Sequence, residues 1–583
     1  MTDETNDNAS LSNHGSKLFI RSEVLAAISN LSLQNEPSKH EKAKQLKRLM
    51  AIPDQVSVQN VLLKELKRST SPQTTRIIAE FLMEVGNIEV VQTPLWDLIQ
   101  DAKSSDDTKD AANLILRHLG DQTDPNIYLD YLEDPAGLIS RETERLLEVS
   151  SRNPEALIDF IDFIFSLPAM EQVRLIESLH EDYTPEYLIN IFIPMILAIP
   201  PAESMEKLLL LLGDIRDPQV ALFLHDFASW FSISDKQTDE HIAKAWKKST
   251  SKLKIAGIYR EDEFEACRSQ KEHKPHPITE TTQLYQCFAT IPDGIGNQGI
   301  IVSRERENGD IAMISVATND LHGIIDCFGF YELERPDFHK LTEKFHEESS
   351  KIQIPASYCL HKLRQAETIN RRNRFRVPYE YSCWKVLLDD VIEEEKSFPE
   401  LLTHCQEWAN IRYSSMGANL YHHPDFCSWF LEEGDHPLVT NIMADVLSQS
   451  SLALTQLENA SQKGLPLEAI EGAFVEKMDS FAEALMLQLL KGEWRGILAA
   501  RLADSAYLLQ AQRAMTFSAL AATQVQVLMS YQTEDADCSS FLKQYGRRCI
   551  EEDLLRLRQE AVPFKNNALF TQMVERVINT WEL

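Results

Sequence analysis

A capping residue followed by proline recurs along the first part of this chain, and its spacing limits how the chain can fold. The five pairs are Thr93-Pro94, Asp124-Pro125, Asn153-Pro154, Thr184-Pro185 and Asp217-Pro218, with the prolines 31, 29, 31 and 33 residues apart. Thr, Asp and Asn side chains accept hydrogen bonds from the free N–H groups of a starting helix. Proline suits the first helical position because it has no N–H to satisfy there. Each pair therefore predicts the start of a helix.

Apolar residues follow these pairs at helical spacing, as Leu157, Ile158 and Ile161 do after Pro154. The preceding helix is in phase, because four of the prolines have apolar residues nine and six positions before them. A two-helix unit cannot bury its apolar faces alone, so it must stack on its neighbours. The pattern predicts an α-solenoid over roughly residues 40–235. An irregular helical bundle with prolines at its helix starts is the alternative.

Two of these junctions resemble the inter-helix turn of HEAT-type repeats. They are Leu119-Gly-Asp-Gln-Thr-Asp-Pro125 and Leu212-Gly-Asp-Ile-Arg-Asp-Pro218. The glycine is expected to allow a left-handed ending of the first helix, and Asp-Pro to open the second. The resemblance covers about a third of the chain, and it implies a fold of stacked helical pairs rather than an activity.

The middle of the chain changes from helical spacing to β-branched residues. Gly299–Arg306 and Ile311–Ala317 flank Asn308-Gly309, a strong hairpin signal in which both central residues are expected to have positive φ. Leu284–Ile291 is a candidate third strand. A ribbon this small is marginal alone, so we expect helices 337–349 and 356–371 to pack on it.

A two-residue turn would set the register of this hairpin. It places Ile301 opposite Val316 and Ser303 opposite Ile314, which makes one face mostly apolar. Arg304 and Arg306 would then project from the other face. The following stretch, residues 317–329, resembles a loop of uncharacterised bacterial repeat proteins through Gly323, Asp326 and Phe328, and this resemblance implies no activity.

The sequence as a whole predicts a mainly α protein: a HEAT-like α-solenoid, a small inserted antiparallel β module and a C-terminal helical domain. A stripe of apolar residues in the last part is typical of a helix: Ile470, Phe474, Met478, Phe481, Leu485 and Leu489. This block is either a diverged solenoid or a bundle. The predicted boundaries are a disordered tail 1–16, repeats 17–245, a linker 246–281, the β module 282–385 and the C-terminal domain 386–583.

Charge and cysteine content narrow the class of partner. The formal charge of −31 repels a phosphate backbone unless basic residues gather locally. The nine cysteines include no C-x-x-C pair, which fits reduced thiols and a cytoplasmic protein. The most apolar stretch, residues 187–199, is too short to span a bilayer and predicts a buried helix.

One cluster of residues is a candidate catalytic site. Asp320, His322, Asp326 and Cys327 lie within eight residues after a predicted strand. A thiolate beside an oriented imidazole and a carboxylate can act as a nucleophile. Members of such sets normally come from separate elements, however, so a capped turn is the simpler interpretation.

A second cluster combines metal-ligand types. His422, His423, Asp425 and Cys427 are close in sequence, and imidazole with thiolate suits zinc. No second ligand pair stands at a defined spacing, so we interpret the segment as a loop. We expect no metal and no cofactor.

The densest cationic run in this acidic chain contains five arginines around Phe375: Arg364, Arg371, Arg372, Arg374 and Arg376. Such a run can hold a phosphate or an acidic partner, or it can balance nearby acidic helices. DNA glycosylases with HEAT-like repeats exist, which leaves nucleic acid as an alternative that the overall charge disfavours.

The sequence favours a scaffold that binds another protein through a helical-repeat surface. An enzyme with its site at the β module is the first alternative. A nucleic-acid or phosphate binder that uses residues 364–376 is the second. No motif names a reaction.

Overall fold

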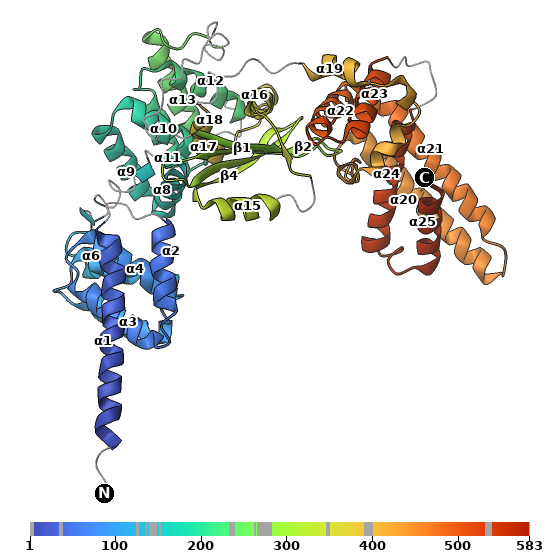
Figure 1. The fold of residues 1–583 in the computed structure, drawn as a ribbon. Helices are drawn as coiled ribbons and strands as arrows, with labels where there is room; N and C mark the ends of the chain where they lie inside the picture. The colour runs from blue at the N-terminus through green and yellow to red at the C-terminus, as the bar shows by residue number, and fades with distance from the viewer. Residues whose placement is uncertain are drawn as a thin grey trace. The chain divides into compact units, whose positions relative to one another are not determined.

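The computed structural model of the chain is shown in Figure 1. The structure describes residues 5–33, 39–123, 127–135, 137–138, 141, 149–150, 153–231, 239–261, 264, 283–344, 350–389, 400–530 and 539–581. It confirms a mainly α protein with a small antiparallel sheet in the middle and a helical C-terminal region. The chain divides into two compact units, residues 1–149 and 150–583.

The first unit consists of helices that pack on near neighbours in the sequence. Its elements are α1 (Thr5–Ser32), α2 (Lys39–Met50), α3 (Gln55–Arg68), α4 (Pro72–Val85), α5 (Ile88–Gln100), α6 (Asp106–His118) and the 3-10 helix η1 (Ile127–Tyr131). Helix α3 packs on α5 and α4 on α6. Contact between alternate helices is what stacked helical pairs produce.

Two predictions for this unit differ from the structure. Helix α1 begins at Thr5, inside the predicted disordered tail, and continues to the packed residues Ile20 and Val24. Pro94 does not start a helix: α5 begins at Ile88 behind the cap Asn87, whose side chain accepts the Glu89 N–H at 3.0 Å. Asn87, which comes before Thr93 in the chain, therefore sets the start of α5.

The second unit begins with six helices at the predicted spacing. They are α8 (Pro154–Ser166), α9 (Ala169–Asp182), α10 (Pro185–Leu197), α11 (Ala202–Leu212), α12 (Pro218–Trp230) and α13 (Glu240–Ile255). The helix starts at Pro154, Pro185 and Pro218 are confirmed, whereas Asp124-Pro125 lies outside the described residues. Asn153 and Asp217 cap through their side chains, but Thr184 makes no such bond.

Alternate helices of this array again lie side by side. Helix α11 packs on both α9 and α13, and buried polar side chains tie the three together. Ser204 donates to Gln172 at 2.8 Å, and Ser249 donates to the Leu209 carbonyl at 2.7 Å. The array therefore continues through α13, into the segment predicted as a linker from residue 246. Small polar residues on the buried face of α13 hid its helical spacing from the sequence interpretation.

The two HEAT-like junctions use their glycines differently. Gly120 has φ +87°, the left-handed ending expected of it. Gly213 has φ −64° and is needed for another reason: a Cβ there would lie 2.6 Å from atoms of Ser249 in α13. The second glycine therefore serves close packing between helices rather than a turn.

The other layer of the array is covered by the β module. Helices α8 and α10 both contact α17 (Tyr379–Trp384), and α8 also contacts β4. Helix α10 is buried on most of its surface, as its apolar sequence predicts. This packing explains why α8–α13 belong to the same compact unit as the sheet, although the sequence predicts separate repeat and β domains.

The sheet has five antiparallel strands in the order β4-β3-β2-β1-β5. They are β1 (Gln283–Ala289), β2 (Asn297–Glu305), β3 (Ile311–Asn319), β4 (Gly323–Leu333) and β5 (Ile352–Gln353). The hairpin of β2 and β3 and the third strand β1 agree with the prediction. Strand β4 replaces the loop expected over residues 317–329, because Asn319 and Gly323 close a turn of only three residues between them.

The β2–β3 turn is one residue longer than predicted. Arg306 N–H donates to the Asp310 carbonyl, and Gly309 N–H donates to the Arg306 carbonyl, both at 2.9 Å. Gly309 alone of the two central residues has positive φ, +86°. This is a type I turn closed by a left-handed glycine, and its extra residue shifts the register by one. Val316 therefore pairs with Ile300, not Ile301, and Ile314 pairs with Val302, not Ser303.

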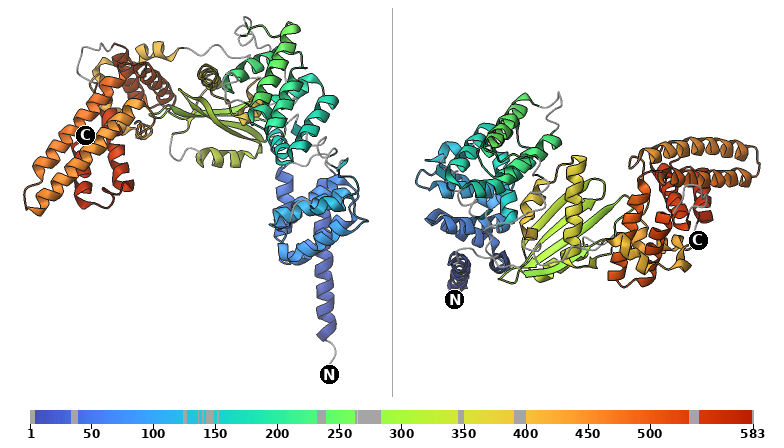
Figure 2. Two further views of the ribbon diagram at one scale, coloured as in Figure 1. Left: turned by 180° about the vertical axis from the view of Figure 1, so that it is seen from behind. Right: turned by 90° about the horizontal axis from the view of Figure 1, so that it is seen from above.

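The shifted register changes what each face carries, since side chains alternate along a strand. Ile300, Val302 and Ile314 face α16 (Ala356–Asn373), whereas Ile301 and Met313 face α15 (Arg335–Lys344), so both faces are covered (Figure 1; Figure 2, right). Arg304 and Arg306 project from the face opposite Ile301, as predicted, but the shifted register places Ile314 and Val316 on their face as well. Both arginines are buried: Arg304 donates to the Leu387 carbonyl at 3.1 Å, and Arg306 pairs with Glu332 at 2.8 Å.

The C-terminal region opens with short elements and ends with long helices. The elements are α18 (Val386–Asp389), α19 (Leu401–Trp408), η3 (Ile411–Tyr413), η4 (Gly417–His422), η5 (Pro424–Phe426), α20 (Pro437–Gln462), α21 (Glu468–Leu489), α22 (Trp494–Ala511), α23 (Met515–Ser530), α24 (Ser540–Glu560) and α25 (Ala568–Trp581). Helices α24 and α25 return to pack on α21, which is the arrangement of a bundle. In the described part of the chain, no helix has the length and apolar character needed to cross a membrane.

Candidate functional site

The candidate catalytic residues begin in the tight turn between β3 and β4. Buried Asn319 organises this turn, because its side-chain oxygen accepts the N–H groups of Leu321 at 2.9 Å and His322 at 3.1 Å. The His322 ring is exposed, and its Nδ1 also lies 3.1 Å from that oxygen. The geometry is that of a capped turn, the simpler interpretation of this sequence.

Gly323 ends the turn, and two observations explain why glycine stands there. Its φ is +81°, and a Cβ would lie 2.2 Å from the side-chain oxygen of Asn370 on α16. Asn370 is fully buried, accepts the Ile324 N–H at 2.7 Å and donates to the His322 carbonyl at 3.1 Å. The turn is therefore fastened to α16 through one amide side chain.

Asp326 and Cys327 do not complete a nucleophilic set. Asp326 is exposed, whereas its neighbour Cys327 is buried at 3% exposure on the opposite face of β4. Burial raises the pKa of the Cys327 thiol well above its usual value, and the nearby Glu380 and Asp326 carboxyl groups add to this shift. A thiol in that state does not supply the thiolate that nucleophilic catalysis requires.

Asp320 belongs to a buried junction between the sheet and the C-terminal helices. Arg501 of α22 is 2% exposed and grips Asp320 with two bonds, Nε to Oδ2 at 2.6 Å and Nη2 to Oδ1 at 2.7 Å. The same guanidinium donates to the carbonyls of Gly294 and Ile295 in the β1–β2 loop. Asp320 is thus a fastening residue for the junction.

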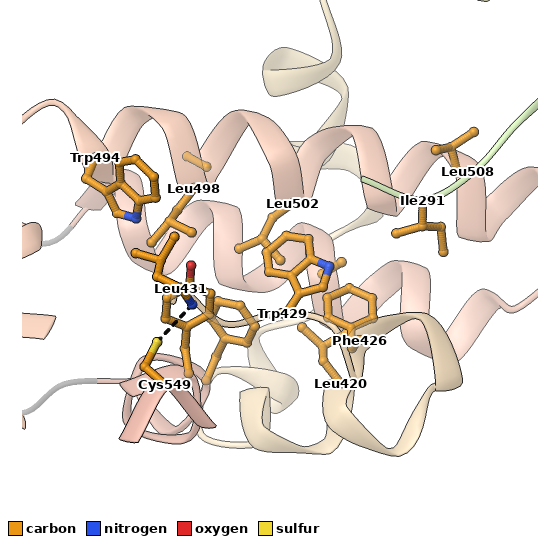
Figure 3. Close-up of a cluster of buried hydrophobic side chains, with 14 of the residues drawn as sticks. Ile291, Leu420, Phe426, Trp429, Leu431, Trp494, Leu498, Leu502, Leu508 and Cys549 are labelled. Carbon is orange, nitrogen blue, oxygen red and sulfur yellow. Dashed lines mark hydrogen bonds between the residues drawn. The ribbon is translucent and has the colours of Figure 1, made fainter. Parts of the chain in front are cut away.

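The β1–β2 loop, residues 290–296, is inserted among the C-terminal helices. Trp429 donates its indole N–H to the Pro292 carbonyl at 2.8 Å, and Tyr545 donates to the Gly294 carbonyl at 3.1 Å. Figure 3 shows Ile291, which belongs to this loop, in the same apolar cluster as Trp429 and Leu508. The sheet therefore contributes part of the core of the C-terminal helices.

A small pocket lies beside this junction, between the end of the sheet, α16 and α22. It is about 40 Å³ in volume and is lined in part by Asp320, Arg501, Lys362 and Asp504. The last two form an ion pair at 2.6 Å. The charges are already paired, and the volume suits a few water molecules. A substrate pocket is typically about 300 Å³ or larger.

The four candidate metal ligands are split between surface and interior. His422 and Cys427 are exposed, whereas His423 and Asp425 are buried. Asp425 accepts the Ser350 N–H at 2.8 Å and lies 3.6 Å from His423 Nδ1. Within the ranges that the structure describes, no group of three or more His, Cys, Asp or Glu residues could hold a metal ion.

The arginine run occupies the C-terminal end of α16 and the segment after it. Arg371 lies 4.0 Å from Glu367 and donates to the Thr368 hydroxyl at 3.1 Å. Arg376 donates to the Leu197 carbonyl at 2.7 Å, at the end of α10. Arg364, Arg372 and Arg374 are exposed. The run is therefore divided between residues with internal partners and residues that face solvent.

Sequence reasoning missed Arg501, Lys362 and Asp504. Arg501 and Asp504 carried a usable signal, since they are the two charged residues in the otherwise mostly apolar run from Ile497 to Leu509, where a charge is costly unless paired. The partner of Arg501, 181 residues away, had no comparable signal. A comparison of the chain with protein-family models and with curated protein sequences finds no match to either.

Proposed function

We propose that this protein is a scaffold of the HEAT-like kind, which binds another protein through its helical-repeat surface. The observation that carries the proposal is the regular stacking of α8–α13, in which helix starts recur at Pro154, Pro185 and Pro218 and alternate helices lie side by side. Stacked arrays of this kind present continuous surfaces that suit extended contacts with a partner.

The proposed surface is the outer side of α9, α11 and α13, here called the α9–α11–α13 layer. The elements that pack on these three helices are other helices of the array, whereas α8 and α10 are covered by α17. Ion pairs cross the layer, such as Lys207 with Glu177 and Lys252 with Asp214 at 2.5 Å. A surface with paired charges of both signs resembles the polar rim of a protein interface rather than an exposed apolar patch.

The geometry of the β module supports this proposal over the enzyme alternative. Asp320 is held by Arg501, the thiol pKa of Cys327 is raised by burial, and the neighbouring pocket is small. These residues have structural tasks that account for their positions. The chemistry of nucleophilic catalysis needs an accessible, activated group instead.

Cross-linking provides the test. The full chain, tagged and expressed in its native cell, would be cross-linked with a lysine-reactive reagent, purified and mapped by mass spectrometry. We expect cross-links to one protein partner from Lys244, Lys247 and Lys248, which are exposed on α13. Cross-links confined to Lys463 and Lys491 of the C-terminal region would contradict the proposed surface. Turnover of a small molecule without a protein partner would contradict the scaffold function.

A further inference from the structure

The outward side of α16 carries two exposed arginines, Arg364 and Arg372. Residues 364, 368 and 372 lie four positions apart and are exposed, while Leu363, Ala366 and Asn370 are buried against the sheet. Positions four apart share one side of a helix, so Arg364 and Arg372 lie on the same side of α16, rotated by about 80° around the axis and about 12 Å apart along it. The helix therefore presents two exposed arginines at a defined spacing.

The end of α16 adds a third arginine and an aromatic ring. Arg374 has φ +62°, its N–H bonds to the Arg371 carbonyl, and the Phe375 N–H bonds to the Asn370 carbonyl at 2.8 Å. This pair of bonds is the Schellman ending of a helix, usually made with glycine. Phe375 is 40% exposed, and its ring centroid lies 5.1 Å from that of His322. An apolar surface thus adjoins the basic strip of three arginines.

The charges of this strip are not balanced from within. Among the residues that the structure describes, no carboxylate lies within ion-pair distance of Arg364, Arg372 or Arg374, whereas Arg371 and Arg376 have internal partners. In a chain of formal charge −31, these three exposed cations lie close together in sequence, and none forms an ion pair within the described part of the chain. Internal contacts account for two of the five arginines, through the ion pair of Arg371 with Glu367 and the bond from Arg376 to the Leu197 carbonyl.

The size of the strip decides which anion fits it. Salt screens charges beyond about 8 Å at physiological ionic strength, so a short ligand is governed by the strip and not by the distant acidic surface. A duplex or a long single strand extends past the strip and meets the negative remainder of the protein. An extended peptide rises about 3.3 Å per residue, so carboxylates four residues apart match the spacing of Arg364 and Arg372.

We propose that Arg364, Arg372, Arg374 and Phe375, here called the α16 strip, form a docking site for a short, extended, acidic protein segment. Carboxylates of that segment pair with the arginines, and an apolar side chain lies on Phe375. The inference rests on the proposed function, because it names the chemistry of a partner, but it concerns a surface separate from the α9–α11–α13 layer.

The test is a fluorescence anisotropy titration of the full chain with a labelled 12-residue peptide. Its Glu residues stand four apart, one Leu follows the last Glu, and Ser and Gly fill the other positions. The test variant is Arg364→Glu with Arg372→Glu. The matched control is Lys463→Glu with Lys491→Glu, which changes the net charge equally at exposed sites far along the chain. A neutral pair, Arg364→Gln with Arg372→Gln, keeps residues that favour helix.

We expect the wild type and the lysine control to bind the peptide with equal affinity. The arginine reversal should lower the affinity by roughly tenfold or more. The neutral pair should be intermediate, and binding should weaken as salt rises. Equal loss in the arginine and lysine variants, or no peptide binding at all, would overturn the site. So would tighter binding of a labelled oligothymidylate that depends on the same arginines, since the site would then be one for nucleic acid.

The cross-linking and peptide experiments can fail separately. If the peptide does not bind while a partner cross-links to α13, the α16 strip is wrong and the scaffold function stands. If the peptide binds and no protein partner is found on α13, the proposed repeat surface is wrong.

Discussion

Arg501 and Asp320 form a bidentate ion pair across 181 residues of sequence, and the arginine is buried at 2% side-chain exposure. Removing the carboxylate leaves a buried cation with carbonyl partners alone. We expect Asp320→Ala to lower the free energy of unfolding by about 3 kcal/mol, the range for breaking a buried pair. Urea denaturation measures this loss.

The exposed carboxylate Asp326 is the control for that measurement, and Asp326→Ala should change stability by less than about 0.5 kcal/mol. Equal effects at both positions would contradict the assignment of Asp320 as a fastening residue. The double variant Asp320→Ala with Arg501→Ala should lose less than the sum of the single variants, because the two share one interaction.

Helix capping in the repeat array can be tested at two equivalent positions. Asp217 accepts the Gln219 N–H at 2.7 Å, whereas Thr184, also before a proline, makes no side-chain cap bond. Asp217→Ala should therefore cost about 1 kcal/mol and Thr184→Ala little. Thermal unfolding of the two variants checks the difference, and similar losses would show that the bond at Asp217 is unimportant.

The left-handed residue at the end of α16 predicts a stabilising substitution. Arg374 has φ +62°, a conformation in which glycine is free of Cβ strain. Arg374→Gly should raise the free energy of unfolding by up to about 1 kcal/mol, whereas Arg372→Gly, inside the helix, should lower it by about 1 kcal/mol. A loss of stability in both variants would argue against the described helix ending.

Two glycines with positive φ separate backbone strain from close packing. Gly309 (φ +86°) is surrounded by open space, whereas a Cβ at Gly323 (φ +81°) would meet Asn370 at 2.2 Å. Gly309→Ala should cost about 1 kcal/mol through strain alone. Gly323→Ala should cost more, about 3 kcal/mol, because α16 must move as well. Equal costs, measured by chemical denaturation, would mean that the β3–β4 turn is not fastened to α16.

Glu380 of α17 predicts a pH dependence. Burial raises its pKa, and the nearby carboxylates of Asp326 and Asp162 raise it further. The folded protein therefore holds this proton more tightly than the unfolded chain, in which the pKa is about 4.3. Its contribution to stability is present below that value and is lost as pH rises through the raised pKa.

Glu380→Gln imitates the protonated form at every pH. The variant should match the wild type near pH 4 and be more stable at neutral pH, as unfolding by urea at both pH values would show. A variant that is less stable at neutral pH would contradict the raised pKa.

Local chemistry let the sequence predict much of the helical architecture. Asn153-Pro154 and Asp217-Pro218 start helices because a cap and a fixed φ act within one turn. Pro94 failed because a second cap, Asn87, competes a few residues earlier. The hairpin position followed from Asn308-Gly309, but the register did not, since it depends on one residue of loop length.

The candidate site could not be predicted for a different reason. Asp320 and Cys327 are close in sequence, which grouped them as one candidate site. In the structure, strand alternation buries Cys327, and Asp320 forms an ion pair with the distant Arg501. The three arginines of the α16 strip, Arg364, Arg372 and Arg374, could be recognised in the sequence as part of a cationic run. Which of the five arginines lack internal partners depends on Glu367 and on the Leu197 carbonyl of α10, and this information is tertiary.

The inserted β1–β2 loop also has a consequence during synthesis. The hydrogen-bond donors to its Gly294 carbonyl are synthesised much later: Arg501 follows 207 residues on, and Tyr545 follows 251 residues on. At a translation rate of about 5–20 residues per second, the nascent sheet stays on the ribosome for tens of seconds with this loop unmatched. A chain released before Tyr545 emerges would keep the loop exposed, a surface that chaperones and proteases can recognise. The full set of bonds between the β1–β2 loop and the C-terminal helices can thus form only after translation has passed Tyr545.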